Sequence, residues 1–94
     1  MTPRIPTLDF LRRDGCELCD EGRLALQQVL EERAVNRQLI PRVRYLDIST
    51  DEELERRHLA TIPVLRYAGQ ELPLATSARR ISRFLAGTLD AALA

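Results

Sequence analysis

Both cysteines of this 94-residue chain lie in one short stretch, RRDGCELCDEG, where only two residues separate Cys16 from Cys19. Random placement of two cysteines gives this spacing roughly one time in fifty, so the spacing alone suggests a function without establishing it. The flanking sequence adds a second constraint. TLDFLRR, residues 7–13, alternates apolar and polar residues as a strand does, and DG at 14–15 is a turn signal. From Cys16 onward the pattern is helical, so the cysteines stand at a junction between a strand and a helix.

The first helix is expected to end between residues 34 and 37. Acidic residues near its start suit the partly positive end of a helix. Its inner face is predicted to carry apolar or small residues at steps of three and four, namely Leu18, Gly22, Leu26, Val29 and Leu30.

The rest of the chain divides into shorter elements. A second strand is predicted at 42–48, and a short helix follows that Ser49 or Thr50 would cap and that would end near Leu59. A third strand is expected within 61–69, with a proline at its entrance. A short fourth strand or edge segment at 71–75 and a terminal helix capped by Thr76 or Ser77 complete the pattern.

This order, β-α-β-α-β-β-α, predicts an α/β fold in one domain that spans residues 1–94. The connection between the first two strands is long enough for a right-handed crossover, so these strands are expected to be parallel. The third and fourth strands are joined by too few residues for a crossover and should form an antiparallel hairpin.

Composition excludes several classes of function. The 14 basic and 14 acidic residues cancel, so binding to nucleic acid or to a membrane surface has no global electrostatic support. No window approaches the roughly 20 apolar residues of a membrane span, and the start of the chain has no long apolar run of the secretory type. We therefore expect a cytoplasmic protein, a setting in which two neighbouring cysteines are more often catalytic or metal-binding than structural.

The junction favours different roles for the two sulfurs. Cys16 would lie at the helix N-terminus, where unpaired N–H groups and the positive end of the helix dipole favour thiolate over thiol. Cys19 would lie on the same side of the helix, within reach of the first sulfur. Arg13 would stabilise a thiolate at Cys16, whereas Glu17 would disfavour one. Attack by Cys16 on a substrate disulfide would form a mixed disulfide that Cys19 could resolve.

The chain resembles the thioredoxin superfamily in the order of its segments: a strand, GCELCD, a helix, a second strand and then TIPVL, which begins 45 residues after the first cysteine. The chain looks most like its small glutaredoxin-like branch, and the resemblance covers nearly the whole chain. It implies a thioredoxin/glutaredoxin-like fold with a four-stranded mixed sheet flanked by helices. It also implies that Cys16 is the nucleophile and Cys19 the resolving thiol.

The resemblance implies a binding site beside the cysteines. Pro63 would be a cis proline that packs next to them, and the backbone of Ile62 would pair with a bound peptide or glutathione. Arg13 matches a basic residue that glutaredoxins often carry at that position. Glu17 and Leu18, which replace the usual proline and aromatic residue, would also contact the substrate.

The glutathione-binding turn of glutaredoxins is replaced here by LATSARR. The hydroxyl groups of Thr76 and Ser77 and the helix N-terminus behind them would still be able to hold a carboxylate.

These observations predict a thiol–disulfide oxidoreductase that cycles between a Cys16–Cys19 disulfide and a dithiol. It would need no metal or organic cofactor, because the sulfurs carry both electrons. Its partner would be a protein disulfide or a glutathione mixed disulfide, with glutathione as a possible co-substrate, and we expect a monomer.

Two alternatives stay open: a thioredoxin-fold module that binds a partner without redox turnover, and a dimer bridged by zinc. A zinc site needs four ligands, and beyond the cysteine pair the chain offers only His58 and carboxylates. His58 itself ends the charged run ELERRH and is expected at the surface of a helix.

Overall fold

The computed structural model describes residues 5–91, and its elements follow the predicted order. The strands are β1 (Thr7–Arg12), β2 (Arg42–Asp47), β3 (Val64–Tyr67) and β4 (Gln70–Leu72). The helices are α1 (Glu17–Val35), α2 (Glu52–His58) and α3 (Ala78–Leu85), with a 3₁₀ turn η1 (Ile48–Thr50) before α2 and a π-helical turn η2 (Ala86–Asp90) after α3. None of the helices within residues 5–91 has the length and apolar character needed to cross a membrane.

The strands form one mixed sheet in the order β2-β1-β3-β4. β1 and β2 are parallel from Thr7 opposite Arg42 to Arg12 opposite Asp47, which confirms the predicted crossover pairing. β3 runs antiparallel to β1, and β3 and β4 form the predicted antiparallel hairpin. β1 therefore lies inside the sheet, and the chain leaves its end directly into the turn that carries the cysteines.

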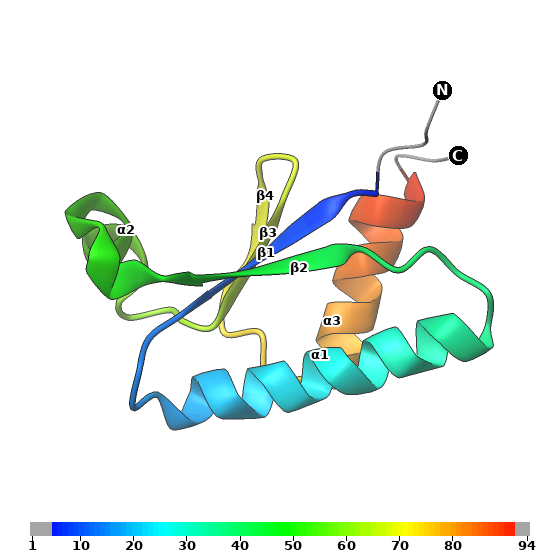
Figure 1. Cartoon of the computed structure of the whole chain (residues 1–94), viewed down its shortest axis with the longest axis horizontal. Coiled ribbons are helices and arrows are strands. Elements are labelled where there is room, and N and C mark those ends of the chain that lie inside the picture. The colour runs from blue at the N-terminus through cyan, green and yellow to red at the C-terminus, as the bar shows by residue number, and fades with distance from the viewer. Residues whose placement is uncertain (1–4, 92–94) are drawn as a thin grey trace.

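One face of the sheet is covered by α1 and α3, which lie on the same side (Figure 1). The core between these layers contains buried side chains from the strands and from both helices, among them Leu8, Phe10, Leu26, Leu65 and Ile81. Full burial of such a side chain contributes roughly 1.5–3 kcal/mol, so this layer supplies most of the apolar stabilisation. The residues that face the core follow the strand and helix periodicities that the sequence shows.

A second, smaller cluster of buried residues surrounds the end of the sheet where α1 begins. It contains Leu11 and Val64 from the strands, Ile48, Ile62 and Cys19, and Leu54 of α2 packs against it. α2 lies beyond this end of the sheet and away from α3 (Figure 1). Both cysteines are thus packed in an apolar cluster that is separate from the main core.

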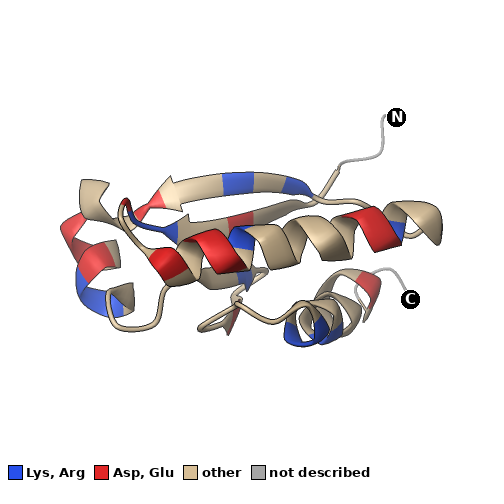
Figure 2. Ribbon diagram, turned by 90° about the horizontal axis from the view of Figure 1, so that it is seen from below, with Lys and Arg blue, Asp and Glu red and all other residues tan. Residues whose placement is uncertain are grey.

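The sheet also carries an ion network that is centred on a buried carboxylate. Asp9 of β1 is only 9% exposed, and its two carboxylate oxygens accept hydrogen bonds from Arg44 of β2 and Arg66 of β3. The three residues lie directly opposite one another in the strand register. Charged residues on the strands are visible as bands in Figure 2. Asp9 therefore links three strands by charge-assisted hydrogen bonds.

The predicted cap of the second helix is wrong. Asp47 accepts hydrogen bonds from the backbone N–H and the hydroxyl of Ser49, which holds residues 48–50 in the 3₁₀ turn. The α-helix begins only afterwards, with Asp51 as its cap, because the Asp51 carboxylate accepts the N–H groups of Glu53 and Leu54. For the last helix, Ser77 is the cap, one of the two residues that the sequence proposed.

The inner face of α1 also differs from the prediction at one position. Leu18 is 46% exposed, and Cys19 takes the inward position instead. The buried residues of α1 are Cys19, Gly22, Leu26, Val29 and Arg33. The helix starts at Glu17, and this phase turns Leu18 to solvent.

Candidate redox site

Cys16 and Cys19 form a disulfide across the first turn of α1, with their Cα atoms 5.2 Å apart. Cys16 is the N-cap residue, and its extended backbone lies outside the helix. Its Sγ accepts a hydrogen bond of 3.0 Å from the backbone N–H of Cys19. One of the otherwise unpaired N–H groups of the helix end therefore points at this sulfur, which is the arrangement that stabilises negative charge there.

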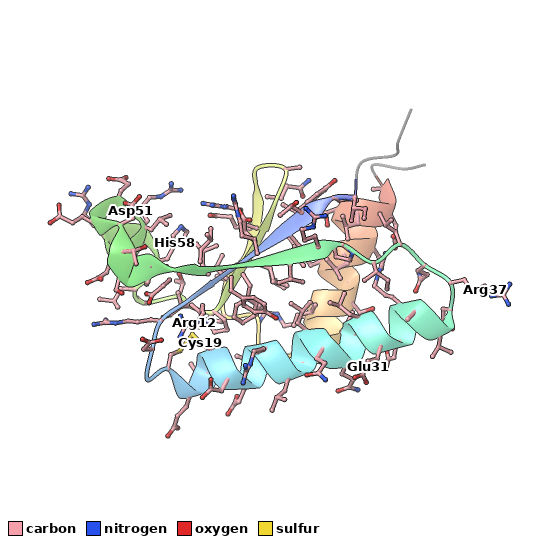
Figure 3. All side chains as sticks on the ribbon, viewed as in Figure 1. Arg12, Cys19, Glu31, Arg37, Asp51 and His58 are labelled. Atoms are coloured by element: carbon pink, nitrogen blue, oxygen red, sulfur yellow. A yellow bond between two sulfur atoms is a disulfide. The ribbon has the colours of Figure 1, made fainter. Side chains whose placement is uncertain are left out.

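The two sulfurs differ in access. Cys16 is half-buried, whereas Cys19 is 4% exposed and belongs to the apolar cluster with Leu11 and Ile62. Figure 3 shows Cys19 at the start of α1, at the same edge of the molecule as Arg12 at the end of β1. An incoming sulfur atom can reach Cys16 more readily than Cys19, so the geometry favours Cys16 as the attacking atom.

A cis proline lies beside the pair. The peptide bond between Ile62 and Pro63 is cis, and Pro63 is buried. Its carbonyl accepts a hydrogen bond of 2.8 Å from the N–H of Ala75, which ties it to the segment that precedes α3. On its other side Pro63 packs against α1 at Gly22, one turn beyond Cys19. The proline is thus held between the start of α1 and the chain before α3.

The comparisons agree with this arrangement. The profile of the family described as "Glutaredoxin-like domain (DUF836)" matches residues 7–92. The chain belongs to this glutaredoxin-like family. No curated protein matches it.

Solved structures show the same fold. The X-ray structure of the Northeast Structural Genomics target protein XcR50 from X. campestris is 32% identical, with a TM-score of 0.70, and the match covers 86% of this chain and 97% of that one. The solution structure of the same target gives a TM-score of 0.67 at 32% identity, over 86% and 94% of the two chains. Trxlp from Edwardsiella tarda EIB202 is similar in fold, with 23% identity and a TM-score of 0.57, over 86% of this chain and 82% of that one. The expected glutaredoxin-like fold is confirmed.

The remaining predicted site residues of this glutaredoxin-like domain fall in two parts of the chain, one around the cysteines and one around Pro63 and the start of α3. Arg13, Glu17 and Leu18 are exposed next to the cysteines in the chain. Arg13 also contributes, behind two hydrogen bonds from Ser49 and the charge of Arg12, to the lowered pKa of Asp47.

Ile62, Thr76 and Ser77 lie on the proline side. The N–H of Ile62 donates to the carbonyl of His58 at 3.0 Å, so this donor is already engaged within the chain. Ser77 Oγ accepts the N–H of Arg80 at 3.3 Å and still has its own hydroxyl proton to donate. Thr76 and Ser77 directly follow Ala75, whose N–H donates to the Pro63 carbonyl, and this hydrogen bond ties their part of the chain to the proline.

Gly22 belongs to the site, although the sequence marked it only as an inward-facing residue. A Cβ atom at this position would lie 2.5 Å from the carbonyl oxygen of Ala75 and 2.7 Å from Cγ of Pro63. Only glycine therefore allows Pro63 and Ala75 to approach α1 so closely. The signal was present in the sequence, because a glycine inside a helix costs about 1 kcal/mol relative to alanine and needs a packing reason.

Arg12 is a second residue that the sequence reading missed. Its guanidinium group forms ion pairs with Asp14 in the cysteine turn and, at 3.6 Å, with Asp47 at the end of β2. The hydrogen bond to Asp14 is the main cause of the raised pKa of Arg12, with smaller contributions from Asp47 and Asp20. Arg12 thereby joins the turn before Cys16 to the neighbouring strand end.

The prediction that His58 lies at a helix surface is wrong. His58 is 4% exposed, because α2 turns Leu54 and His58, four residues apart, toward the rest of the protein. Its Nε2 lies 3.5 Å from Glu71 Oε2 of β4, and its carbonyl accepts the N–H groups of Thr61 and Ile62. His58 therefore anchors the segment that leads to Pro63. Within residues 5–91 no three His, Cys, Asp or Glu side chains come together as metal ligands would.

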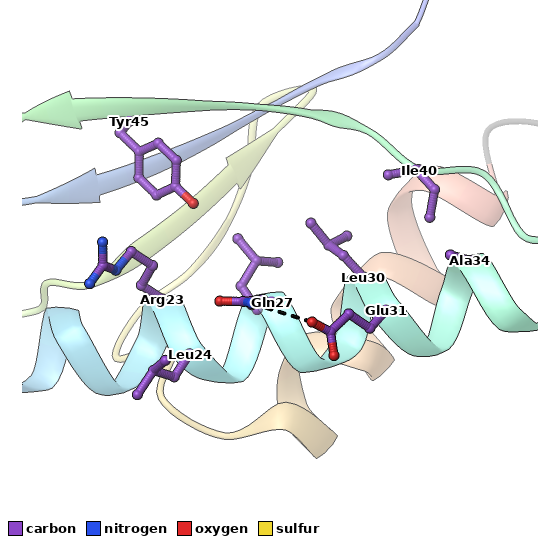
Figure 4. A pocket seen from close by; sticks show the side chains of 9 residues that line it. Arg23, Leu24, Gln27, Leu30, Glu31, Ala34, Ile40 and Tyr45 are labelled. Carbon is purple, nitrogen blue, oxygen red and sulfur yellow. Dashed lines mark hydrogen bonds between the residues drawn. The ribbon is translucent and has the colours of Figure 1, made fainter.

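A groove of about 590 Å³ lies away from the disulfide, between α1 and the edge strand β2 (Figure 4). Leu24, Leu30, Ile40 and Tyr45 supply much of its apolar lining. A neighbouring groove of about 400 Å³ shares Arg23 and Tyr45 with it and extends to Arg12 and Asp20 near the cysteine turn.

Proposed function

We propose that this glutaredoxin-like domain is a thiol–disulfide oxidoreductase that uses Cys16 and Cys19 as its redox pair. The observation that carries the proposal is the disulfide at the N-terminus of α1, where the more accessible sulfur accepts a helix N–H group. Thiolate is the attacking form of cysteine, and a helix N-terminus favours it. The buried partner is held three residues away, where it can close the bridge again.

The reaction needs no cofactor, since the sulfurs carry both electrons. In the reduced protein the Cys16 thiolate attacks one sulfur of a substrate disulfide, and the other substrate sulfur leaves as a thiolate that takes up a proton. The product is a mixed disulfide between Cys16 and the substrate. Cys19, after losing its proton, attacks the Cys16 sulfur and releases the second substrate thiol. The protein is oxidised to its disulfide, and one substrate disulfide is reduced to two thiols.

The substrate would lie between the exposed residues of the cysteine turn and the proline side of the site. We propose contacts from Arg13, Glu17 and Leu18 on the first side, and from Ile62 and the hydroxyl groups of Thr76 and Ser77 on the second. A protein disulfide and a glutathione mixed disulfide are both suitable substrates by this chemistry. We place the reaction in the cytosol and propose that the protein acts as a monomer.

A partner-binding module without redox turnover is the second candidate function. The apolar groove between α1 and β2, with Leu24 63% exposed and Tyr45 50% exposed, supports it because this groove lies apart from the disulfide. The two functions predict different redox behaviour. A module without turnover would keep its disulfide in glutathione buffers that reduce a working oxidoreductase, or would never form it.

A redox titration of the purified protein tests the proposal. The protein is equilibrated with glutathione buffers of increasing oxidised fraction, and free thiols are then counted by mass labelling. We expect the Cys16–Cys19 disulfide to be reduced in the most reducing of these buffers and to form again in the most oxidising ones.

Two variants assign the roles of the cysteines. Cys16→Ser should abolish the reduction of a substrate disulfide, whereas Cys19→Ser should accumulate a mixed disulfide at Cys16. Full activity of Cys16→Ser would refute the proposed function. The removal of either cysteine abolishes the same internal disulfide, so each variant is the control for the other.

A further inference from the structure

Strand β2 forms an open edge of the sheet. In the strand order β2-β1-β3-β4 it pairs with β1 alone among the described strands. The N–H of Arg42 donates to the carbonyl of Pro6, so the backbone groups of Arg42, and by alternation those of Arg44, face β1. The backbone groups of Val43 and Tyr45 therefore point away from the sheet. An edge of this kind presents donors and acceptors that another strand can bond.

The two faces of this edge differ in chemistry. Val43 packs against the main core and Tyr45 contacts the ring of Phe10, so both side chains lie on the face that α1 covers. Arg42 and Arg44 lie on the opposite face, where both are exposed. Along β2, apolar residues on the α1 side thus alternate with basic residues on the other side.

The groove between α1 and β2 lies along this edge, on the face to which Tyr45 points. Tyr45 and Ile40 from the β2 side and Leu30 from α1 face this space of about 590 Å³ (Figure 4). Tyr45 is 50% exposed and Ile40 is 38% exposed, so both carry apolar surface that a partner can bury. A strand added beside β2 would direct every second side chain to the groove side.

The face opposite α1 carries positive charge at this edge. Arg44 and Arg66 share the single carboxylate of Asp9, so these three residues together have one positive charge in excess. Glu71 lies opposite Arg66 on β4, at the far side of the network from β2. Arg42 forms no ion pair within residues 5–91. Acidic side chains are therefore the complement of this face of the edge.

We propose that β2 and the groove along it form a docking site for an extended segment of a partner protein in which acidic residues alternate with apolar ones. The segment adds a strand to the sheet, and its backbone bonds Val43 and Tyr45. Its apolar side chains enter the groove, and its acidic side chains lie opposite Arg42 and Arg44. A helix in the same groove could not bond the edge, because its own backbone groups are bonded internally. The site is separate from the disulfide and goes beyond the proposed redox reaction, which does not depend on it.

A second copy of this chain fits the edge less well. In an antiparallel pair of β2 strands, a register centred on Val43 sets Arg42 opposite Arg44 of the other copy. A register centred on Arg44 sets this residue opposite itself, and like charges directly opposite each other are destabilising. A register centred on Tyr45 sets Arg44 opposite Leu46 and offers it no acidic partner. A segment with acidic residues at these positions is the better occupant.

Three eight-residue peptides and two protein variants test the site. Valine alternates with glutamate in the first peptide, lysine replaces glutamate in the second, and serine replaces valine in the third. Arg42→Glu reverses one charge of the edge and leaves the hydrogen bonds of Asp9 in place. Arg79→Glu is the matched control, because Arg79 is exposed on α3, does not line the groove and forms no ion pair within residues 5–91.

NMR titration of the full chain measures affinity, and amide hydrogen exchange shows which backbone groups the peptide covers. The valine–glutamate peptide should bind wild type with a dissociation constant below about 1 mM. Exchange at Val43 and Tyr45 should then slow by up to about tenfold at nine-tenths saturation, because only the unbound tenth exchanges freely. Exchange at Arg44 should not change, since its N–H already faces β1.

The charge and the groove make separate contributions. Arg42→Glu should raise the dissociation constant of the valine–glutamate peptide by about three- to tenfold, because an attractive cross-strand pair becomes repulsive. The valine–lysine peptide should bind Arg42→Glu more tightly than wild type by a similar factor. The serine–glutamate peptide should bind wild type at least about tenfold more weakly, since it buries little apolar surface in the groove. Arg79→Glu should match wild type with all three peptides.

Val43→Pro tests the backbone bond directly. Proline removes the outward N–H of this residue and leaves the N–H groups that face β1 in place. The affinity for the valine–glutamate peptide should fall by about fivefold, the loss expected for one hydrogen bond. Protection of the Arg44 amide reports whether the variant is folded. If it is not, the charge exchange between Arg42→Glu and the two valine peptides decides the matter.

Several results would overturn this inference. They are equal binding of the glutamate and lysine peptides to wild type, binding that leaves exchange at Val43 and Tyr45 unchanged, and no binding at millimolar peptide. Sedimentation of the free protein as a dimer in which these two amides are already protected would show that a second copy occupies the edge, and would overturn it as well. The proposed function is tested apart from all of these, by the redox titration and by Cys16→Ser.

Discussion

The contact between α1 and the cis proline leads to a strong prediction for Gly22→Ala. The new methyl group would lie 2.5 Å from the Ala75 oxygen, and this distance would have to open by about 0.5 Å to reach the 3.0 Å below which real Cβ contacts essentially do not occur. Neither neighbour yields easily: Ala75 is bonded to Pro63 through its backbone, and the second contact, at 2.7 Å, is with the proline ring. Helix α1 must therefore move away from the proline.

The size of the effect follows from two opposing terms. Overpacking of a rigid site costs about 1–3 kcal/mol, and two unyielding neighbours place this site near the upper end. Alanine inside a helix recovers about 1 kcal/mol relative to glycine. We expect a net decrease of about 2 kcal/mol in the free energy of unfolding. For a domain of this size that corresponds to a melting temperature roughly 8–16 °C lower.

Urea unfolding of the oxidised protein, followed by far-UV circular dichroism, measures the loss. Gly87→Ala is the matched control, because a Cβ at Gly87 meets no atom within 4 Å and the residue is exposed in the π-helical turn η2. That variant should be as stable as wild type or up to about 1 kcal/mol more stable. In the reduced protein, Gly22→Ala should also expose Cys19 to faster alkylation by iodoacetamide, since the helix that buries it is displaced.

The reasoning would be refuted if Gly22→Ala were as stable as Gly87→Ala and its Cys19 reacted at the wild-type rate. The close approach of α1, Pro63 and Ala75 would then not constrain the protein. If Gly22→Ala were as stable as Gly87→Ala but its Cys19 reacted faster than in wild type, only the predicted size of the stability loss would be wrong.

Two further predictions concern buried and capping carboxylates. The hydrogen bond from the Ser49 hydroxyl is the chief reason why the pKa of Asp47 lies below its ordinary value of 3.8. The stability that ionised Asp47 contributes is therefore fully present above pH 3.8 and is lost as the pH falls through the lowered pKa. Asp47→Asn should therefore unfold at lower urea than wild type at pH 7, and the two midpoints should converge as the pH falls below the lowered pKa of Asp47. Asp9→Asn should lower the free energy of unfolding by about 1–3 kcal/mol in urea titrations at pH 7, because Arg44 and Arg66 lose the carboxylate that they share; an unchanged midpoint would show that solvent replaces it.

Most of the fold could be predicted from the sequence, because its elements are short and each has a clear local pattern. Alternation in 7–13 and 42–48 marked the two parallel strands, and the observed strands agree with these ranges within one residue. The same local reasoning placed Cys16 at a helix start, where the structure has it as the N-cap. At the start of α2 the sequence predicted the wrong cap, Ser49 or Thr50. Asp47 stabilises a 3₁₀ turn at residues 48–50, which periodicity does not reveal, so the α-helix begins later, with Asp51 as its cap.

What the sequence alone determined is the order of the elements and the position of two sulfurs at a helix N-terminus, since both depend on residues within a few positions of one another. The tertiary structure decided which groups surround them. Gly22 meets Pro63 and Ala75, His58 meets Glu71, and these partners are distant along the chain. Periodicity describes which face of an element is apolar, but it does not say which residue of another element lies against it. The close contact of α1 with Pro63 and Ala75 exists only because the folded backbone brings these segments together.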